Sequence, residues 1–159
     1  MWKRNYSRIR FFVCLTGLAG ILSACASMGC YEDNSVRLQV GFYQQSSSSL
    51  VAIDSVSIWG VGSDSLLYNN KSLQTFELDL NPLSNETRYV IRVQDGLFRM
   101  QDTLTIRHQN QPWYESSDCG CVLHSSIDTC FTSETLFDSV TIQERQVQSN
   151  DIQHILLNI

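Results

Sequence analysis

The stretch that decides the fold reads YVIRVQDGLFRMQDTLTIR and covers residues 89–107. On either side of Asp95-Gly96, apolar and polar residues alternate, which is the pattern of a strand that buries one face. An Asp-Gly pair between two such runs favours a tight hairpin. We therefore expect two antiparallel strands, and the second has the clearest apolar face, formed by Phe98, Met100, Leu104 and Ile106.

The same alternation recurs after residue 33, and no window of about ten residues or more reads as an amphipathic helix. Further apolar runs cover residues 36–42, 51–58, 66–68, 76–80, 122–123, 137–142 and 155–159. Strands at intervals of roughly ten residues indicate an antiparallel sandwich or barrel. We predict an all-β protein with one antiparallel β-sandwich of the immunoglobulin-like or Greek-key type, because 159 residues leave room for one domain.

The N-terminus has the pattern of a secretion signal. Four basic residues precede an apolar run over residues 11–22, which is shorter than the roughly 20 residues that a membrane-spanning helix needs. The run ends in Leu22-Ser23-Ala24-Cys25, which resembles the lipobox of bacterial lipoproteins. We therefore expect a lipoprotein signal peptide at 1–24, a lipidated tether at 25–33 and the β-sandwich at 34–159. Ordinary cleavage near Ala24, with Cys25 paired elsewhere, is the alternative.

These features predict a protein held by lipid on Cys25 in the bacterial cell envelope, at the outer membrane. They leave open whether the domain faces the periplasm or the outside. Removal of residues 1–24 leaves seven basic and 16 acidic residues, a formal net charge of −9. Nucleic acid is therefore an unsuitable partner, because binding it requires clustered Lys and Arg. The nearest approach to a basic cluster is a set of four arginines on predicted solvent-facing sides of strands, at Arg88, Arg92, Arg99 and Arg107.

Four cysteines remain once Cys14 leaves with the signal and Cys25 carries lipid, namely Cys30, Cys119, Cys121 and Cys130. An even number in an oxidising compartment predicts two disulfides. A bond between Cys119 and Cys121 would close a small, strained ring. We expect Cys30 to pair with one of these two cysteines and Cys130 with the other.

The same region offers a metal or redox site as an alternative. Cys119, Cys121, His124 and Cys130 are four soft ligands that zinc accepts. Their spacing matches no standard zinc finger, and Cys-Gly-Cys is not the Cys-x-x-Cys motif of thioredoxin-like enzymes. We therefore expect no metal and no cofactor, and we favour structural disulfides.

No catalytic motif is present: the chain lacks a Walker loop, a Gly-x-Ser-x-Gly elbow and a His-Glu-x-x-His pair. The histidines at 108, 124 and 154 have no paired spacing, so we expect a non-catalytic binding or structural domain. Aromatic residues near turns, Trp59, Trp113 and Tyr114, are candidates for binding an extended glycan or an envelope protein. For Trp113 itself, we expect a buried core position rather than an exposed one. A subunit of a surface assembly, paired through an edge strand, is a third possibility.

Five of the ten aspartates precede Ser or Thr. Where an aliphatic residue follows, the pattern resembles the O-glycosylation sequon of the Bacteroides group, which makes Ser55, Ser65, Thr103 and Ser139 candidate acceptors. Turn chemistry leading into strands is the alternative explanation.

The chain resembles small lipoproteins of Bacteroides-type bacteria that share a domain of unknown function. The resemblance rests on the lipobox at Cys25, on residues 54–70, on the strand 102–106 and on Cys119-Gly120-Cys121. It implies an envelope location and a β fold, and it implies no activity, since the shared motifs are structural.

Overall fold

The computed structural model describes residues 37–116, 120–133, 135–148 and 151–159. The predicted signal peptide, the lipidation site Cys25, the tether and Cys30 lie outside these residues, and so does Cys119. The domain boundaries predicted for the N-terminal region therefore stay predictions.

Within the described residues there are eleven strands and no helix. They are β1 (Leu38–Gln44), β2 (Ser49–Leu50), β3 (Ile53–Gly60), β4 (Leu66–Leu73), β5 (Thr75–Leu78), β6 (Glu86–Asp95), β7 (Phe98–Ser116), β8 (Gly120–Phe131), β9 (Ser139–Ile142), β10 (Gln146–Val147) and β11 (Ile155–Asn158). Three runs are longer than expected. The strand at 66–68 continues to Leu73, the second strand of the hairpin continues to Ser116 as β7, and the strand at 122–123 extends over residues 120–131 as β8. In this part of the chain, no helix is long and apolar enough to cross a membrane.

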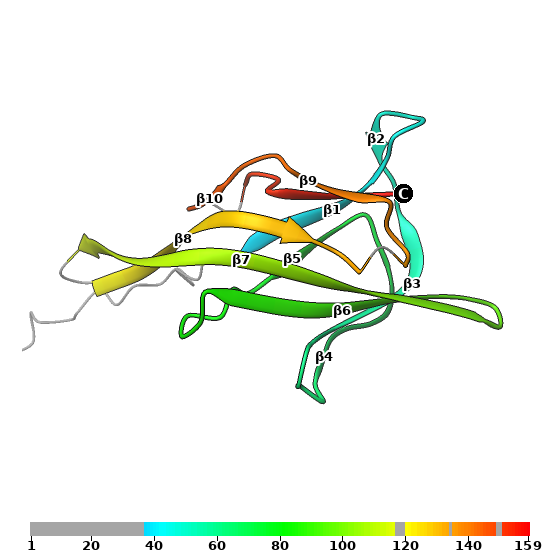
Figure 1. Cartoon of the computed structure of the whole chain (residues 1–159), viewed down its shortest axis with the longest axis horizontal. Helices are drawn as coiled ribbons and strands as arrows, with labels where there is room; N and C mark the ends of the chain where they lie inside the picture. The colour runs from blue at the N-terminus through cyan, green and yellow to red at the C-terminus, as the bar shows by residue number, and fades with distance from the viewer. Residues whose placement is uncertain (1–36, 117–119, 134, 149–150) are drawn as a thin grey trace, which may run out of the picture.

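The strands form two sheets that pack face to face, so the predicted β-sandwich is confirmed (Figure 1). One sheet has the order β2-β1-β11-β9, with β5 also paired to β1, and the other has the order β10-β8-β7-β6-β3-β4. Nearly all pairs are antiparallel, as predicted. The exception is the parallel pair of β1 and β11, with Val40 opposite Ile155, which joins the two ends of the described domain.

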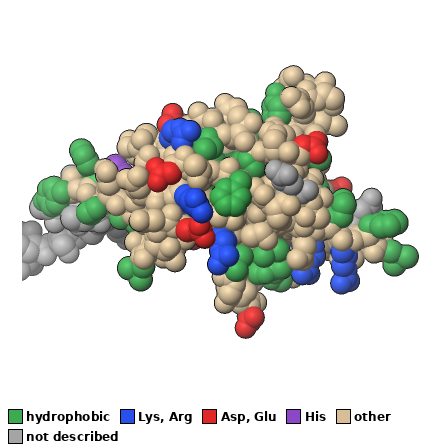
Figure 2. Space-filling view, viewed as in Figure 1, with side chains coloured by type: hydrophobic (Ala, Val, Ile, Leu, Met, Phe, Trp, Pro, Cys, Tyr) green, Lys and Arg blue, Asp and Glu red, His purple; other side chains and the backbone are tan. Residues whose placement is uncertain are grey.

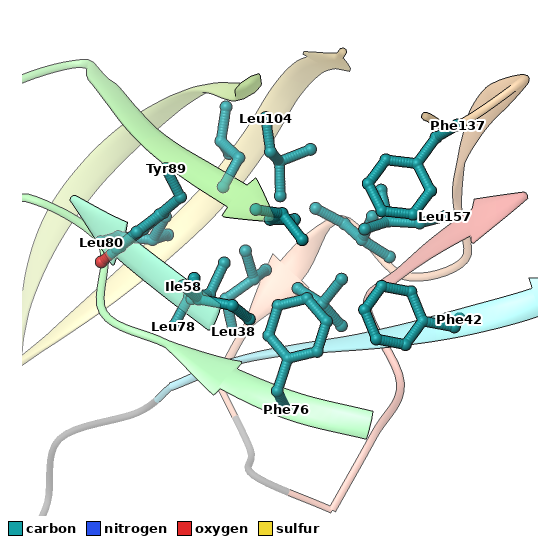
Figure 3. Close-up of a cluster of buried hydrophobic side chains, with 14 of the residues drawn as sticks. Leu38, Phe42, Ile58, Phe76, Leu78, Leu80, Tyr89, Leu104, Phe137 and Leu157 are labelled. Carbon is teal, nitrogen blue, oxygen red and sulfur yellow. The ribbon is translucent and has the colours of Figure 1, made fainter. Parts of the chain in front are cut away.

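The core lies between the two sheets and consists of their inward-facing aliphatic and aromatic side chains (Figure 3). Phe42 of β1 is fully buried in this core, with its ring centroid 5.2 Å from that of Phe76 and 5.7 Å from that of Phe137. These rings come from distant parts of the chain. Side-chain packing therefore joins β1, β5 and the segment before β9.

The hairpin of β6 and β7 forms where the sequence predicts it, with Asp95 opposite Phe98. The two turn residues are Gly96 and Leu97, and Gly96 has φ +57, which glycine adopts without strain. Leu104 and Ile106 are buried as expected, but Phe98 and Met100 are exposed, so the dry face predicted for them is wrong. The cause is length, because the hairpin runs past the elements that cover the rest of its face (Figure 1).

Candidate functional site

The far halves of β7 and β8 form a two-stranded ribbon. The two strands pair as far as Ser116 and Gly120, whereas β6 follows β7 only to Arg107 and β10 pairs only with Ser125 and Ser126 of β8. The ribbon therefore extends beyond the neighbouring strands (Figure 1). Residues 111–114 of its β7 half are exposed and alternate between the two faces of the ribbon, which is what a surface for recognition requires.

A small hollow lies on the outer face of this ribbon, where β7, β8 and β10 run side by side. Its volume is about 160 Å³, and it is lined by Gln111, Trp113, His124, Ser125, Ser126, Gln146 and Gln148. Pockets that enclose a whole drug-sized ligand have volumes of about 300 Å³ or more. The hollow is therefore suited to a single ring or side group of a longer ligand.

An aromatic pair forms one wall of the hollow. The rings of Trp113 and His124 are stacked, with centroids 5.7 Å apart and an interplanar angle of 14°. Their positions follow from register, because Gln111 lies opposite His124 and Trp113 is two residues further along the same face. Trp113 is 60% exposed, so the expected core position is wrong and an aromatic surface is open to a ligand.

Amide and hydroxyl groups supply the rest of the lining. Gln146 Nε2 donates to Ser126 Oγ at 3.2 Å, and Gln148 Nε2 donates to Gln146 Oε1 at 3.3 Å. No Asp, Glu, Lys or Arg lines the hollow. Amides carry both donors and acceptors, so this chemistry favours a neutral polar ligand over an ion.

A buried polar network supports the ribbon from its inner side. Asn110 Nδ2 donates to the carbonyl of Asn81 at 2.9 Å, so Asn110 Oδ1 is free to accept from Ser125 Oγ at 2.8 Å. His108 Nδ1 lies 2.9 Å from the same oxygen and therefore carries the proton, while its Nε2 accepts from Thr87 Oγ1 at 2.8 Å. Burial lowers the pKa of His108, which keeps this ring neutral. These bonds fix Ser125 at the edge of the hollow.

The three aromatic residues predicted to bind a partner do not form one site. Trp59 lies in β3 and Trp113 in β7, so the prediction that loops carry them is wrong. Trp59 pairs with Val90 of β6, and Val90 pairs with Thr103 of β7. Thr103 is ten residues before Trp113, so Trp59 and Trp113 are separated by about 30 Å along the direction of β7. The guanidinium of Arg92 covers the Trp59 ring at 4.5 Å. Only Trp113 lines the hollow.

Tyr114 follows Trp113 directly and is also exposed, at 63%. Successive side chains of a strand point to opposite faces, so Tyr114 faces away from the hollow. Sequence reasoning missed Gln146 and Gln148. Their spacing of two residues places both on one strand face, but only the pairing of β10 with β8 brings them to Trp113.

The cysteine predictions are partly corrected. Cys130 is a free, half-buried thiol, and burial raises its pKa to about 12. Cys121 lies nine residues earlier in the same extended strand, more than about 25 Å away, whereas a disulfide needs α-carbons within about 7 Å. A bond between these two is excluded because β8 holds them apart. The side chain of Cys121 lies outside the described part, as do Cys30 and Cys119, and their pairing stays a prediction.

The alternative zinc site is wrong for the same reason. His124 and Cys130 are six residues apart in β8, about 20 Å, so they cannot share one ion. Among the residues that the structure describes, no three His, Cys, Asp or Glu side chains gather as metal ligands.

The candidate glycosylation sites differ in accessibility. Ser65 is exposed in the segment before β4, and Ser139 is exposed at the start of β9, where its Oγ accepts from Asn158 at 2.9 Å. Ser55 and Thr103 are half-buried in strands. Asp102, the sequon residue before Thr103, is buried and bonded to the chain, which gives this aspartate a structural role.

Arg88, Arg99 and Arg107 are exposed, as expected, whereas Arg92 is half-buried against Trp59. Arg88 and Arg107 flank Glu86, with N–O distances of 3.6 and 3.3 Å, and all three side chains are well exposed. Such exposed pairs contribute little stability.

Comparison with protein families finds one match, a model described as a family of unknown function, over residues 55–159. The matched region includes every residue of the hollow. Neither the curated proteins nor the solved structures give a match.

Proposed function

The chain belongs to DUF6452, a family of unknown function, and since membership brings no activity with it, we propose from the site itself that the domain is a non-catalytic module that binds a neutral glycan. The observation that carries this proposal is the uncharged hollow beside Trp113, where an open aromatic face meets three glutamine side chains. Sugar rings have an apolar face that packs on aromatic rings and hydroxyls that both donate and accept hydrogen bonds, so they match this lining.

The size and setting of the hollow support a chain-like ligand. It accepts one ring, and two residues before Gln111 on the same face of β7 the exposed Gln109 offers an amide to a neighbouring ring. The absence of charge in the lining disfavours an anionic polymer.

A non-catalytic role is supported by the buried titratable groups, which are occupied in holding the fold. Asp102 and His108 each bond to neighbouring groups of the chain, and neither lines the hollow. The high pKa of Cys130 leaves little thiolate near neutral pH, so this thiol is a poor nucleophile.

Trp113→Ala is expected to weaken glycan binding about thirtyfold or more, because a central aromatic anchor contributes about 2 kcal/mol or more. Binding of neutral oligosaccharides is measured by calorimetry or by saturation-transfer NMR. Tyr114→Ala is the matched control, since it removes an equally exposed aromatic side chain from the opposite face of the same ribbon.

The control also separates glycan from protein ligands. If Tyr114→Ala weakens binding as much as Trp113→Ala, the partner contacts both faces of the ribbon. That result would favour a protein ligand over a glycan. If no neutral oligosaccharide binds the wild-type chain, the proposal is wrong.

We further propose that this module is a lipoprotein of the cell envelope in a Bacteroides-type bacterium, lipid-anchored at the outer membrane through Cys25. The support is the basic start, the short apolar run and the small residues before Cys25. Membership in the family leaves this proposal open.

The mass of the chain exported from such a host tests the anchor. The expected result is loss of residues 1–24 and a diacylglycerol adduct on Cys25, both absent in Cys25→Ala. The same spectra show whether Ser65 and Ser139, the exposed sequons, carry hexose and whether Cys30, Cys119 and Cys121 are oxidised. A processed chain that begins elsewhere and lacks lipid contradicts the proposal.

The assembly alternative finds less support. Edge strand β4 pairs with β3 through several register shifts, and Asn70 within it has φ +50. Such irregular edges hinder pairing with a second chain.

A further inference from the structure

The end of the β6–β7 hairpin presents apolar side chains that the fold does not use. Leu97 is 99% exposed and Phe98 78%, and Met100, two residues further along the same face, is also exposed. Figure 2 shows apolar side chains at this end of the molecule, beyond the body, with Lys or Arg side chains beside them. The hairpin is at the end of the molecule opposite to the Trp113 ribbon (Figure 1).

The turn itself does not require these residues. Gly96 supplies the single positive φ of the turn. The backbone at Leu97 would therefore accept a polar residue equally well. Phe98 and Met100 continue the core-facing stripe of β7 beyond the part that is covered, so Phe98 is 78% exposed and Met100 48%. A contiguous exposed apolar group of this kind marks an interaction surface, whereas single exposed apolar residues are ordinary.

The shape and charge of the hairpin end restrict its partner. The surface is convex and projects from the body, while sites for small molecules are concave. Arg99 lies between Phe98 and Met100 in β7 and points to the opposite face, where it is exposed. A projecting apolar tip next to a cation matches the interface of a lipid bilayer, which accepts apolar side chains beneath anionic phosphates.

We propose that the end of the β6–β7 hairpin inserts into a membrane surface that contains anionic lipid. Leu97 and Phe98 enter the boundary between head groups and acyl chains, and Arg99 pairs with lipid phosphate. This contact is independent of glycan binding, since the hollow and the hairpin end share no residue. It is also independent of a lipid on Cys25.

A tryptophan placed in the tip tests insertion in the full-length chain. Phe98→Trp is mixed with phosphatidylcholine vesicles, with and without phosphatidylglycerol, whose acyl chains are brominated so that they quench inserted indole rings. Leu83→Trp is the matched control, because Leu83 is 95% exposed in a different turn. The native tryptophans and the N-terminal segment are common to both variants.

The expected result is quenching of Phe98→Trp in excess of the wild-type chain, and none in excess for Leu83→Trp. Adding Arg99→Glu to Phe98→Trp lowers the lipid affinity from the quenching titration about fivefold or more, since one basic residue near an anionic surface contributes about that factor. Replacing Leu97 with serine in the same background also lowers it, by about tenfold.

Two results overturn the proposal. One is equal quenching at positions 98 and 83. The other is a wild-type chain that dimerises without vesicles and becomes monomeric in Leu97→Ser, because a second copy then covers the tip.

Discussion

Asp102→Ala is expected to lower the free energy of unfolding by about 3–5 kcal/mol, as for other buried charged groups whose removal leaves their partners unpaired. Domains of this kind have total stabilities of about 5–15 kcal/mol, so the variant would be close to unfolding. The measurement is urea denaturation of the variant and the wild-type chain.

The reason is the number of groups that this carboxylate serves. Asp102 is 1% exposed, and its Oδ1 accepts from the backbone N–H of Thr103 at 2.8 Å, from that of Ser133 at 2.7 Å and from the Ser133 hydroxyl. Its Oδ2 faces the backbone N–H groups of residues 135–137 at 3.1 to 3.3 Å. The carboxylate therefore shapes the segment that leads to Phe137. Alanine removes this acceptor from all of these donors, and of them the Thr103 N–H keeps a second acceptor, Ser133 Oγ at 3.0 Å.

The pH dependence has a defined sign. Burial opposes the charge of Asp102, but the hydrogen bonds from Ser133 and from the backbone outweigh it and hold its pKa below the usual 3.8. A carboxyl with a lower pKa in the folded state contributes stability that is present above 3.8 and is lost as the pH falls through the folded-state value. The free energy of unfolding of the wild-type chain therefore approaches that of Asp102→Asn as the pH is lowered.

Asp64→Asn is the matched control, because Asp64 is exposed. We expect it to change the free energy of unfolding by less than about 0.5 kcal/mol. An Asp102→Asn variant as stable as the control would contradict the role assigned to the carboxylate, because asparagine keeps the size but places an amide NH₂ against at least one set of donors.

Phe42→Ala is expected to lower the free energy of unfolding by about 3–5 kcal/mol, the usual range for removal of a buried phenylalanine. The ring is fully buried and stacks on Phe137 at an interplanar angle of 17°, with Phe76 tilted against it (Figure 3). Truncation leaves a cavity that the two remaining rings, Phe76 and Phe137 on separate segments, cannot fill. Thermal and urea unfolding measure the loss.

Phe98→Ala is the control for this variant, because Phe98 is mostly exposed and should change stability by less than about 0.5 kcal/mol. An equal loss of unfolding free energy in Phe42→Ala and Phe98→Ala would contradict the central role of Phe42 in the core. Since Asp102 orders the segment that carries Phe137, its effect and that of Phe42 should be coupled. The double variant Asp102→Asn/Phe42→Ala should lose less than the two single losses added together.

Much of the fold could be predicted from local pattern. Alternation from Tyr89 to Ile106 identified a hairpin, and similar runs identified most other strands, because one buried face imposes a period of two on any strand. The extent of β8 could not be read in this way, since residues 124–130 are mixed in polarity. Pairing with β7 extends the strand through them.

Only part of the candidate site could be predicted from the sequence. Trp113 was named as a binding candidate, although a core position was expected for it, and its separation from Tyr114 and from Trp59 depends on the strand in which each lies. Gln146 and Gln148 joined the site only through the pairing of β10 with β8, which links residues about 20 positions apart. A single sequence carries no signal for that pairing.

The sequence by itself determined the class of fold. Each strand buries one face, and this requires alternating apolar residues within the strand itself, so the pattern is visible locally. Tertiary structure alone decided which apolar stripe is covered, as the exposed Phe98 and the buried Leu104 on one face of β7 show. It also turned Asp102 into a buried support and joined β1 to β11 in parallel. These outcomes depend on contacts between distant segments, and alternation in a sequence specifies which face is buried without specifying what covers it.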